Sequence, residues 1–563
     1  MNAAVLAVLT LVIFGLGYRF YSGFLSRRIF ALSEDEPVPS REFEDGVDFV
    51  PTRKFILWGH HYTSIAGAAP IVGPAIAVIW GWLPALVWVG LGTVFMGAVH
   101  DFAALVISLR NRGRSIGEVA GTVVNPRVRT LFLLIVSFLI WVVLAVFAFI
   151  IGTLFVSNPG AIFPINVQIL VALVLGWLVY SRGISIGAPS LVAYALLLGA
   201  IFLGDDFAAA FPAVTELSVE AWVWILLIYS FVASVLPVWL LLQPRDYLNS
   251  HQLIVGLSLL ILGLLILHPP IGAPMVNPNP PGAPPLFPFL FITIACGAIS
   301  GFHGLVCSGT TSKQIDRMTD ARPIGYGGML GEGTLGLLAV LATTAGLALT
   351  SDWHAHYASW GAASGLSVKL AAFVTGGASF VAAVGVPIET AKTFIAVMVI
   401  AFAATSLDTG ARIQRLVIAE LAESWNLRPL TNRYAAGAVG IGAALLLAVT
   451  QGGGKGGLIL WPLFGTTNQL VAGVTLLVVS VWLRRQGKPV VYTLVPMVFV
   501  GLATFFAMLG EVQRYFAHFS EQWLLALIGS LVLVLDVWVV GEGLRVLVGS
   551  PGTPPGGSRH ARA

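Results

Sequence analysis

Charged residues are scarce in this chain. Its 563 residues include 30 Lys and Arg and 26 Asp and Glu, which is 10% of the total, whereas a soluble protein of this length carries roughly 140 charged residues. Hydrophobic residues make up 57%, which is more apolar surface than a soluble globule can hide behind its polar exterior. The composition therefore excludes a soluble enzyme or a nucleic-acid-binding protein and indicates that lipid is the solvent for most of the chain.

Cysteine and the familiar catalytic motifs are also sparse. The two cysteines, Cys296 and Cys307, are too few for a disulfide framework or a four-ligand zinc site. The sequence has no phosphate-binding loop, which disfavours an ATP-driven pump, and no Gly-x-Ser-x-Gly or His-Glu-x-x-His motif. We therefore expect a protein that is not an enzyme and that needs neither a cofactor nor a bound metal.

Long apolar stretches recur along the whole sequence and predict an all-α polytopic membrane protein. About 20 apolar residues are needed for a helix to cross the hydrocarbon core, and a helix satisfies its own backbone there. Fifteen stretches qualify: 2–24, 55–80, 84–109, 130–157, 165–181, 187–204, 221–242, 252–268, 289–312, 325–350, 388–410, 434–451, 458–482, 490–510 and 523–548. The segment 366–386, rich in Gly and Ala, is ambiguous.

Basic residues predict the orientation, because cytoplasmic loops carry an excess of Lys and Arg. With the N-terminus outside and 366–386 as a re-entrant or surface segment, 26 of the 30 basic residues fall inside. If 366–386 crossed the membrane, this bias would collapse. The sequence therefore predicts an external N-terminus, a retained first helix with no signal-peptide cleavage site, and a cytoplasmic C-terminus.

Two of the predicted spans carry residues that interrupt helices. Two glycines and two prolines lie within Gly67–Pro74 of span 55–80, and Pro237 lies in span 221–242. Proline removes a backbone donor and clashes with the preceding turn, and an unwound segment must face protein or water rather than lipid. Each broken span begins a group of five, and the two groups have opposite orientations. This is the pattern of a secondary transporter with a five-plus-five inverted repeat and a site at the membrane midplane.

Ionisable side chains inside the predicted spans are functional candidates, since they are costly in a membrane. His60, His61, His100, Asp101, His303 and Glu332 all lie at such positions. They fit proton carriers, whose charge changes near physiological pH, but they also fit helix packing, and the histidines with Cys307 admit a metal site as a further reading. Asp408 and Arg412 are four residues apart and can pair on one helix face as a structural clamp.

Hydroxyl side chains follow His303. Ser308, Thr310 and Thr311 flank Gly309 and could provide hard oxygen ligands for a small cation, together with carbonyls freed at the first break. The competing interpretation is that these hydroxyls bond their own helix backbone, as is usual in membrane helices.

Several motifs resemble those of the carbon starvation protein A family. They lie between residues 50 and 485: Trp58–Gly67, Val99–Phe102, Leu236–Tyr247, Ser308–Thr311, Ile324–Leu330 with Glu332, Ser406–Asp408, and Leu460–Gly465 with Asn468 and Gln469. Members of that family are described as bacterial inner-membrane carriers of peptides during carbon starvation or of pyruvate with protons. The resemblance implies a core of the five-plus-five type, in which both broken helices frame the substrate and helices beyond the core are peripheral.

The resulting hypothesis is a secondary symporter of short peptides or a small carboxylate such as pyruvate, coupled to protons or sodium. It expects a small-molecule or peptide substrate and a lipid bilayer as partners and no nucleic acid, and it leaves the oligomeric state open. A passive channel and a membrane redox protein that binds metal or haem through its histidines are the alternatives. The expected units are 1–54 (peripheral), 55–204 (first repeat), 205–412 (second repeat, with a Pro-rich external loop 268–288), 413–548 (peripheral) and 549–563 (a disordered tail).

The expected site residues fall into three groups. Substrate is expected to contact His60, His61, Tyr62, Ser64, Gly67, Gly73, Ser234, Pro237 and Trp239. Ion coupling is assigned to His100, Asp101, Ser308, Thr310, Thr311 and Glu332, with His61 as a further proton candidate. Structural or gating roles are assigned to Arg245, Asp246, Asp408 and Arg412.

Overall fold

Helices form almost all of the protein. The computed structural model describes residues 1–349, 351–450 and 452–549, and across these residues the β-pairing is limited to two isolated bridges. Ten of the described helices are long and apolar enough to cross a membrane, or up to twelve if each of two bent pairs is one span. The predicted all-α polytopic fold is confirmed. The tail expected to be disordered lies, apart from Gly549, outside the described residues.

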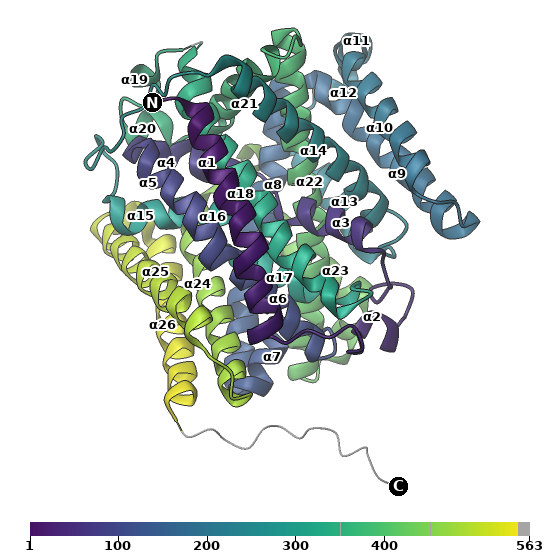
Figure 1. Ribbon diagram of the computed structural model, residues 1–563, viewed down its shortest axis with the longest axis vertical. Coiled ribbons are helices and arrows are strands. Elements are labelled where there is room, and N and C mark those ends of the chain that lie inside the picture. The colour runs from purple at the N-terminus through teal and green to yellow at the C-terminus, as the bar shows by residue number, and fades with distance from the viewer. Residues whose placement is uncertain (350, 451, 550–563) are drawn as a thin grey trace.

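The chain begins with helices that include the first bent pair (Figure 1). They are α1 (Ala3–Leu16), α2 (Pro39–Glu42), α3 (Lys54–Ile65), α4 (Ala69–Ala77), α5 (Trp82–Val87), α6 (Ala98–Arg110), α7 (Ile116–Val123), α8 (Pro126–Ser157), α9 (Ile162–Arg182), α10 (Gly187–Phe202), α11 (Gly204–Ala210) and α12 (Pro212–Thr215). π-Helical turns over Trp88–Gly97 join α5 to α6 in one long span, Trp82–Arg110.

The later helices run from α13 to α26. They are α13 (Val219–Val235), α14 (Leu242–Leu267), α15 (Leu286–Thr293), α16 (Ala295–Ala298), α17 (Gly301–Gly309), α18 (Gly327–Leu341), α19 (Trp353–His356), α20 (Trp360–Ala363), α21 (Leu366–Ala382), α22 (Ile388–Ser424), α23 (Arg433–Val449), α24 (Gly456–Arg485), α25 (Val491–Ala517) and α26 (Phe519–Val548). Flanking turns extend α18 to a span over Met318–Leu349.

Local sequence signals explain where several of these helices begin. The side chain of Asn125 accepts a hydrogen bond from Val128 N at 2.9 Å, and Pro126 occupies the first turn of α8. Ser218 accepts a hydrogen bond from Ala221 N at the start of α13. Such caps satisfy amide groups that have no partner within the helix, and proline costs least at that position.

The centre of the protein is formed by α8 and α22, which pack against each other and are contacted by α13, α23 and α24. The helices α9 to α12 lie at one edge, and α25 and α26 lie at the other (Figure 1). Large apolar side chains are exposed on these outer helices, for example Leu170 on α9 and Leu531 on α26. Such exposed apolar surface fits contact with lipid tails.

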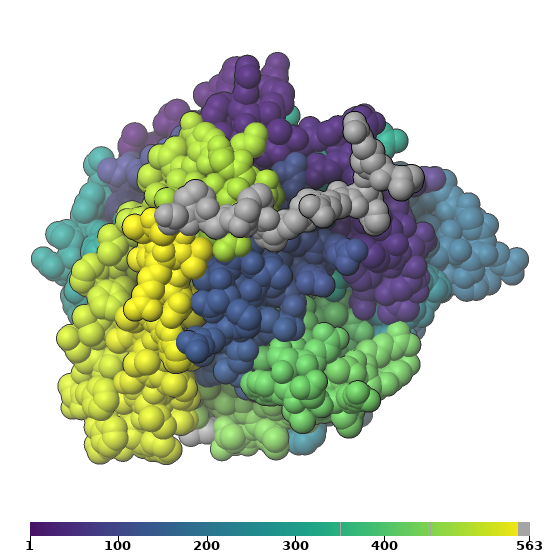
Figure 2. Space-filling view, turned by 90° about the horizontal axis from the view of Figure 1, so that it is seen from below, coloured from purple at the N-terminus to yellow at the C-terminus, as the bar shows by residue number. Residues whose placement is uncertain are grey.

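Basic loops gather at one end of the molecule. The N-terminus of α1 lies at the opposite end from α2, α7 and the end of α26 (Figure 1). Figure 2 views the latter end, where purple N-terminal, blue and green parts of the chain meet. Here Arg110 pairs with Glu36 at 2.6 Å, and Arg41 pairs with Asp316 at 2.7 Å. The loops that the sequence placed on the cytoplasmic side are thus neighbours in space.

Two broken segments run side by side in opposite directions. The pair α3–α4 is bent by 46° at Ala66–Ala68. The second break lies between α16 and α17, where Ile299 and Ser300 are extended. The residues just before α3 pair with those after α17, since Thr52 N donates to Gln314 O at 3.0 Å. At the other end, Trp80 Nε1 donates to Pro284 O at 3.1 Å, just before α15.

This arrangement corrects one prediction. Pro237 does not interrupt a span, because α13 ends at Val235 and α14 begins at Leu242, so that Pro237 lies in the connection between two helices. The predicted span 289–312 is instead the broken one, divided into α15, α16 and α17. Proline was the more visible sequence signal, but the second break occurs among Gly297, Ile299, Ser300 and Gly301.

The ambiguous segment 366–386 forms α21, a helix of 17 residues. It packs against α4, α14 and α22. The span containing α18 begins beside Lys54, at the end of the molecule with the basic loops, whereas α22 reaches that same end at Arg412, which pairs with Asp48. Since α18 leads away from that end and α22 returns to it, α21 does not cross between them. The charge distribution favoured a re-entrant or surface placement for this segment.

Candidate functional site

The first break is held open by α22. Ser406 Oγ donates to Ser64 O at 3.0 Å, and Thr409 Oγ1 donates to Ser64 Oγ at 3.1 Å. The first bond gives Ser64 O a partner where the break removes the helical one, and the second ties the Ser64 side chain to α22. A Cβ atom at Gly67 would lie 2.6 Å from Ser406 Oγ, so this close approach requires glycine. Pro70 opens α4, where its missing N–H costs little.

The second break is supported by α24. Asn468 Oδ1 accepts from Phe302 N at 2.9 Å and from Ser300 Oγ at 3.3 Å. One amide side chain thus satisfies the backbone where α17 begins. Because the N-terminus of a helix carries partial positive charge, the starts of α4 and α17 together form an environment suited to an anionic group.

A buried cluster of histidines and carboxylates lies beside the second break. His100 Nδ1 is 2.7 Å from Asp101 Oδ1, and His303 Nδ1 is 3.0 Å from Asp101 Oδ2. His303 Nε2 is 3.0 Å from Glu332 Oε2. All four side chains are buried, and they come from α6, α17 and α18. His303 therefore bridges two carboxylates inside the membrane, where a proton can be held or passed on.

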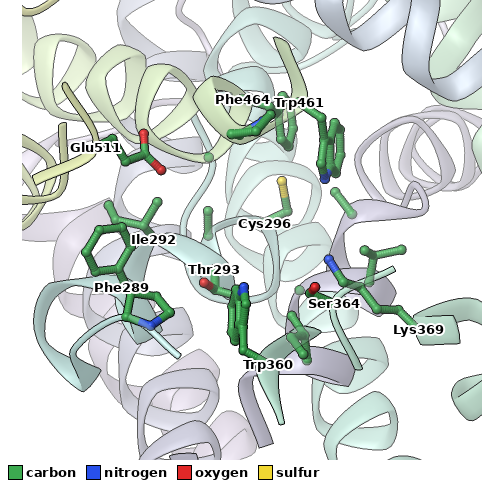
Figure 3. A pocket seen from close by; sticks show the side chains of 18 of the residues that line it. Phe289, Ile292, Thr293, Cys296, Trp360, Ser364, Lys369, Trp461, Phe464 and Glu511 are labelled. Carbon is green, nitrogen blue, oxygen red and sulfur yellow. The ribbon is translucent and has the colours of Figure 1, made fainter. Parts of the chain in front are cut away.

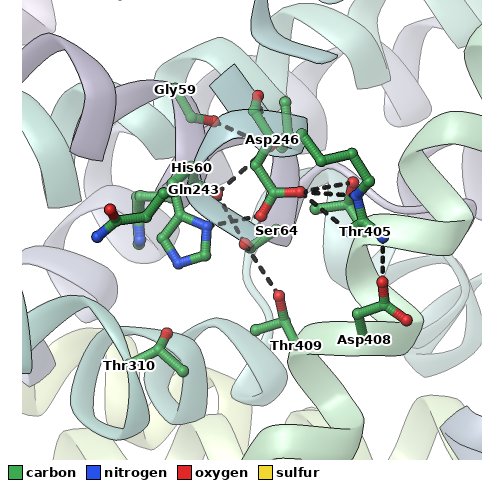
Figure 4. A network of polar contacts seen from close by, with 12 residues as sticks. Gly59, His60, Ser64, Gln243, Asp246, Thr310, Thr405, Asp408 and Thr409 are labelled. Atoms are coloured by element: carbon green, nitrogen blue, oxygen red, sulfur yellow. Dashed lines mark hydrogen bonds and ion pairs between the residues drawn. The ribbon is translucent and has the colours of Figure 1, made fainter. Parts of the chain in front are cut away.

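A second polar network joins α3, α13, α14 and α22 (Figure 4). His60 Nδ1 lies 2.6 Å from Asp246 Oδ2, and Arg245 donates to Asp246 Oδ1 at 2.9 Å. Arg245 also forms an ion pair with Asp408, which accepts a hydrogen bond from Tyr229 at 2.9 Å. One guanidinium thus compensates two buried carboxylates, as a charge in this environment requires.

His61 and Tyr62 connect the first broken helix to its neighbours. His61 Nδ1 lies 2.9 Å from Thr311 Oγ1, and Tyr62 Oη donates to Gly331 O at 2.7 Å. Ser308 and Thr310 use their hydroxyl hydrogens on the backbone, donating to Gly304 O at 2.7 Å and Val306 O at 3.0 Å. Ser308 and Thr310 therefore bond to the backbone of their own helix, which was the competing interpretation for these hydroxyls.

The predicted residues near Pro237 lie away from the first break. Ser234 Oγ donates to Phe231 O, and Trp239 Nε1 donates to Gly46 O at 3.1 Å. Val238 N donates to Val47 O at 3.1 Å. This connection therefore packs on the loop before α3, at the end of the molecule with the basic loops. Gly73 lies elsewhere, on the wall of the cavity described below.

The expected pair of Asp408 and Arg412 is not formed. Asp408 pairs with Arg245, while Arg412 pairs with Asp48 and donates to Leu236 O. Both partners come from distant parts of the sequence, which explains why helical spacing suggested the wrong pair. The clamp is therefore one between α22 and the loop before α3.

Asp48 is the anion that holds this clamp together, because it pairs with both Arg412 and Arg415. Arg415 donates to both of its carboxylate oxygens, at 2.8 and 2.9 Å. Burial acts to raise the pKa of Asp48, but the cations of Arg412, Arg415 and Lys313 outweigh it and hold the pKa well below its usual range. Asp48 is therefore ionised throughout the physiological pH range, and the clamp is a permanent ion pair rather than a pH sensor.

A cavity of about 310 Å³ lies on the side of the breaks opposite to the clamp formed by Asp48, Arg412 and Arg415. It is lined from α4, α15, α16, α20, α21, α24 and α25, and Figure 3 shows the side chains around it. A much smaller void of about 10 Å³ lies behind it, against Gly67, His303 and Ser406. Ala69, Cys296 and Phe464 line both spaces. The cavity thus leads toward the breaks, and these three residues separate it from the small void beside them.

Sequence reasoning missed several residues of this arrangement as site residues. Lys369 faces the cavity from within the range expected for the second repeat, and Glu511 faces it from the range expected to be peripheral. Asn468 supports the second break. The available signals were the rarity of basic residues on the side assigned as external and the Gly297–Gly301–Gly304 spacing. Among the described residues, no group of three or more His, Cys, Asp and Glu side chains is placed to hold a metal ion.

Known proteins resemble this chain over most of its length. The sequence model of the family described as "Carbon starvation protein CstA" matches residues 2–359 and 354–507. Peptide transporter CstA of Campylobacter jejuni is 33% identical, covering 92% of this chain and 81% of its own. Pyruvate/proton symporter BtsT of Escherichia coli is 32% identical, covering 90% and 81%.

Solved transporter structures show a weaker likeness. A manganese transporter of Eremococcus coleocola is 12% identical with a TM-score of 0.49, covering 89% of this chain and 99% of its own. The family match and the curated relatives are far stronger. On their evidence, this chain belongs to the carbon starvation protein CstA family.

Proposed function

We propose that the chain is a secondary active symporter that imports short peptides or a small carboxylate such as pyruvate. The observation on which this rests is the meeting of two oppositely directed broken helices with a buried cluster, in which His303 lies between Asp101 and Glu332. Broken helices at the midplane serve substrate and ion binding in inverted-repeat carriers. The names of the relatives, peptide transporters and a pyruvate/proton symporter, support the same class.

A proton is the coupling ion that the cluster favours. His303 can carry a proton between two carboxylates, and Glu332 Oε1 has no hydrogen-bond partner among the described residues. The hydroxyls of Ser308 and Thr310 donate to the backbone, which leaves their oxygen lone pairs free, so sodium is the alternative coupling ion. Substrate carboxylate would lie at the amide groups that open α4 and α17.

Alternating access fits a protein that is open at one end, through the cavity, and closed at the other by ion pairs. The cavity reaches Cys296 and Phe464, whereas the opposite end is held by Asp48 with Arg412 and Arg415. A passive channel needs a continuous path, and the small void at the breaks does not provide one. A carrier that opens one end at a time fits these observations better.

The helix contacts favour repeat boundaries that differ from those expected from the sequence. α13 packs on α8 and α22 as α23 packs on α22 and α8, and α14 packs on α3 as α24 packs on α17. We therefore assign α3–α6, α8, α13 and α14 to the first repeat, and α15–α18 and α22–α24 to the second. The hairpin α9–α10, together with α1, α21, α25 and α26, lies outside this core.

The same proposal includes the orientation. The end with the clamp carries the basic loops, so it is assigned to the cytoplasm, and the N-terminus is assigned to the outside. The cavity then faces outward in a bacterial inner membrane.

The proposal is tested by uptake into proteoliposomes. Radiolabelled pyruvate and dialanine would each be supplied with an inward proton gradient, with an inward sodium gradient, and with neither. We expect accumulation above equilibrium with the proton gradient. Equal uptake under all three conditions would contradict symport.

A further inference from the structure

The outward cavity contains opposite charges at its two ends. Figure 3 shows Lys369 at one side and Glu511 at the other, with both head groups directed toward the space between them. Lys369 comes from α21 and Glu511 from α25, two helices outside the proposed repeat core. The two side chains are only 9% and 6% exposed. These charges are therefore buried deeply enough to matter for any molecule in the cavity.

Neither side chain forms an ion pair with a described residue, although Arg514, on the same helix as Glu511, also lines the cavity. The Lys369 ammonium forms no hydrogen bond or ion pair with any described residue. Glu511 accepts one long hydrogen bond, from Thr466 at 3.4 Å. Burying an ionisable group without a close partner is costly, so two such groups that face one cavity indicate a ligand that supplies partners for them.

The position of Lys369 is also unusual for the sequence. By the charge distribution, 4 of the 30 basic residues fall on the external side, and two of these, Lys369 and Arg514, line this one cavity. Trp360 and Trp461 form apolar walls between the charged ends. A ligand with an anionic end, a cationic end and an apolar middle would match Lys369, Glu511 and these two walls.

We propose that this cavity is an outer binding site for short zwitterionic peptides, in which Lys369 binds the C-terminal carboxylate and Glu511 binds the N-terminal ammonium. The inference rests on the proposed transport function and narrows its substrate class. Pyruvate has one charge and would leave Glu511 without a partner. A volume of about 310 Å³ is at the small end of ligand pockets, which suits a peptide of two or three small residues. From here the peptide would pass Cys296 to the breaks.

The test is a binding measurement on the full-length protein in detergent, which does not depend on transport. Titration calorimetry would compare dialanine with N-acetyl-dialanine, dialanine amide and pyruvate. Loss of a charge-assisted contact weakens binding by about ten- to a hundredfold, so we expect each blocked peptide and pyruvate to bind at least about tenfold more weakly than dialanine.

Variants then assign each end. Lys369→Gln should bind free and amidated dialanine equally weakly, and Glu511→Gln should bind free and acetylated dialanine equally weakly. Lys392→Gln and Glu389→Gln are matched controls, because these residues pair with each other at 2.9 Å on exposed surface outside the cavity. They should bind dialanine as the wild type does.

The outcomes separate this inference from the proposed function. Failure of dialanine to bind, or equal binding of free and blocked dialanine by the wild type, would overturn the outer site, and this comparison requires no variant to fold. Unchanged discrimination in Lys369→Gln would overturn it as well. Binding that follows the predicted order without gradient-driven uptake in liposomes would instead contradict symport and leave the outer site standing.

Discussion

At the scale of residues, the ionisable side chains buried beside the breaks lie in groups. Asp101, His303 and Glu332 form one group, and Asp246, Arg245 and Asp408 form another. A single charged side chain at the centre of a membrane helix costs about 3 kcal/mol by insertion scales. Each group reduces that cost by placing opposite charges together, so removing one member exposes the cost of the others.

The first prediction concerns Asp101→Asn. Without this carboxylate His100 and His303 lose their shared anion, so we expect gradient-driven uptake to fall at least about tenfold, a typical effect of losing a charged hydrogen bond. Uptake in proteoliposomes at matched protein content measures this. Asp536→Asn is the control, since Asp536 is also buried but lies on the peripheral α26. Equal losses in both variants would speak against a coupling role for Asp101.

A second prediction concerns the glycine at the first break. Gly67→Leu would force a side chain against Ser406 Oγ and Phe147, which a Cβ atom alone would approach to 2.6 and 3.1 Å. We expect uptake to be abolished and the melting temperature to fall, because overpacking costs about 1–3 kcal/mol. Gly199→Leu, at an exposed position with open space around it, should leave both unchanged. A fully active Gly67→Leu protein would show that the break needs no close approach.

Single site residues were predictable from the sequence where the residue type itself was unusual for a membrane helix. His60, His61, Asp101 and Glu332 stood out because ionisable groups are rare in apolar stretches, and the structure buries all four near the breaks. Their partners were not predictable. The pairs Asp408–Arg245 and Arg412–Asp48 join residues 163 and 364 positions apart, and no local spacing encodes such contacts.

At the scale of elements, the sequence signal is strong for the first helix break and weak for the second. The first has Pro70 and Pro74 beside its glycines, and it was predicted correctly. The second has no proline between Ala295 and Gly301, and its extended residues depend on Asn468 from another helix. Pro237 was misleading because proline also suits the connection between two separate helices.

The third prediction concerns Asn468→Ala. Its loss leaves Phe302 N and Ser300 Oγ without this partner in a buried site, which costs about 1–3 kcal/mol. We expect a lower melting temperature and reduced uptake. Asn166→Ala is the matched control, because Asn166 bonds only to Ile162 O on its own helix, at 2.8 Å. If the two variants melt alike, the second break does not depend on Asn468.

At the scale of the whole molecule, the distribution of Lys and Arg predicts a side of the membrane for each loop, and the basic loops that it places together are neighbours in space. It also favours a re-entrant or surface placement for 366–386. The assignment of helices to the repeats was harder to predict from the sequence, because the two helices of the hairpin α9–α10 have the apolar composition of ordinary membrane spans. The packing of α13 on α8, and of α23 on α22, supports the proposal that this hairpin lies outside the core.

The fourth prediction tests the orientation. Cys296 lines the cavity that is proposed to face outward, whereas Cys307 is fully buried and does not line it. A membrane-impermeant maleimide added outside intact cells should therefore label Cys296, and Cys296→Ser should abolish the labelling. Labelling that occurs only in inverted vesicles would place the cavity on the cytoplasmic side.

The central claim, that substrate and a cation move together, is tested most directly by measuring cation flux driven by substrate alone. Proteoliposomes loaded with pH- and sodium-sensitive dyes would receive external dialanine or pyruvate with no ion gradient imposed. We predict that the lumen acidifies as substrate enters and that Asp101→Asn prevents this. Substrate entry with neither proton nor sodium movement would contradict the account.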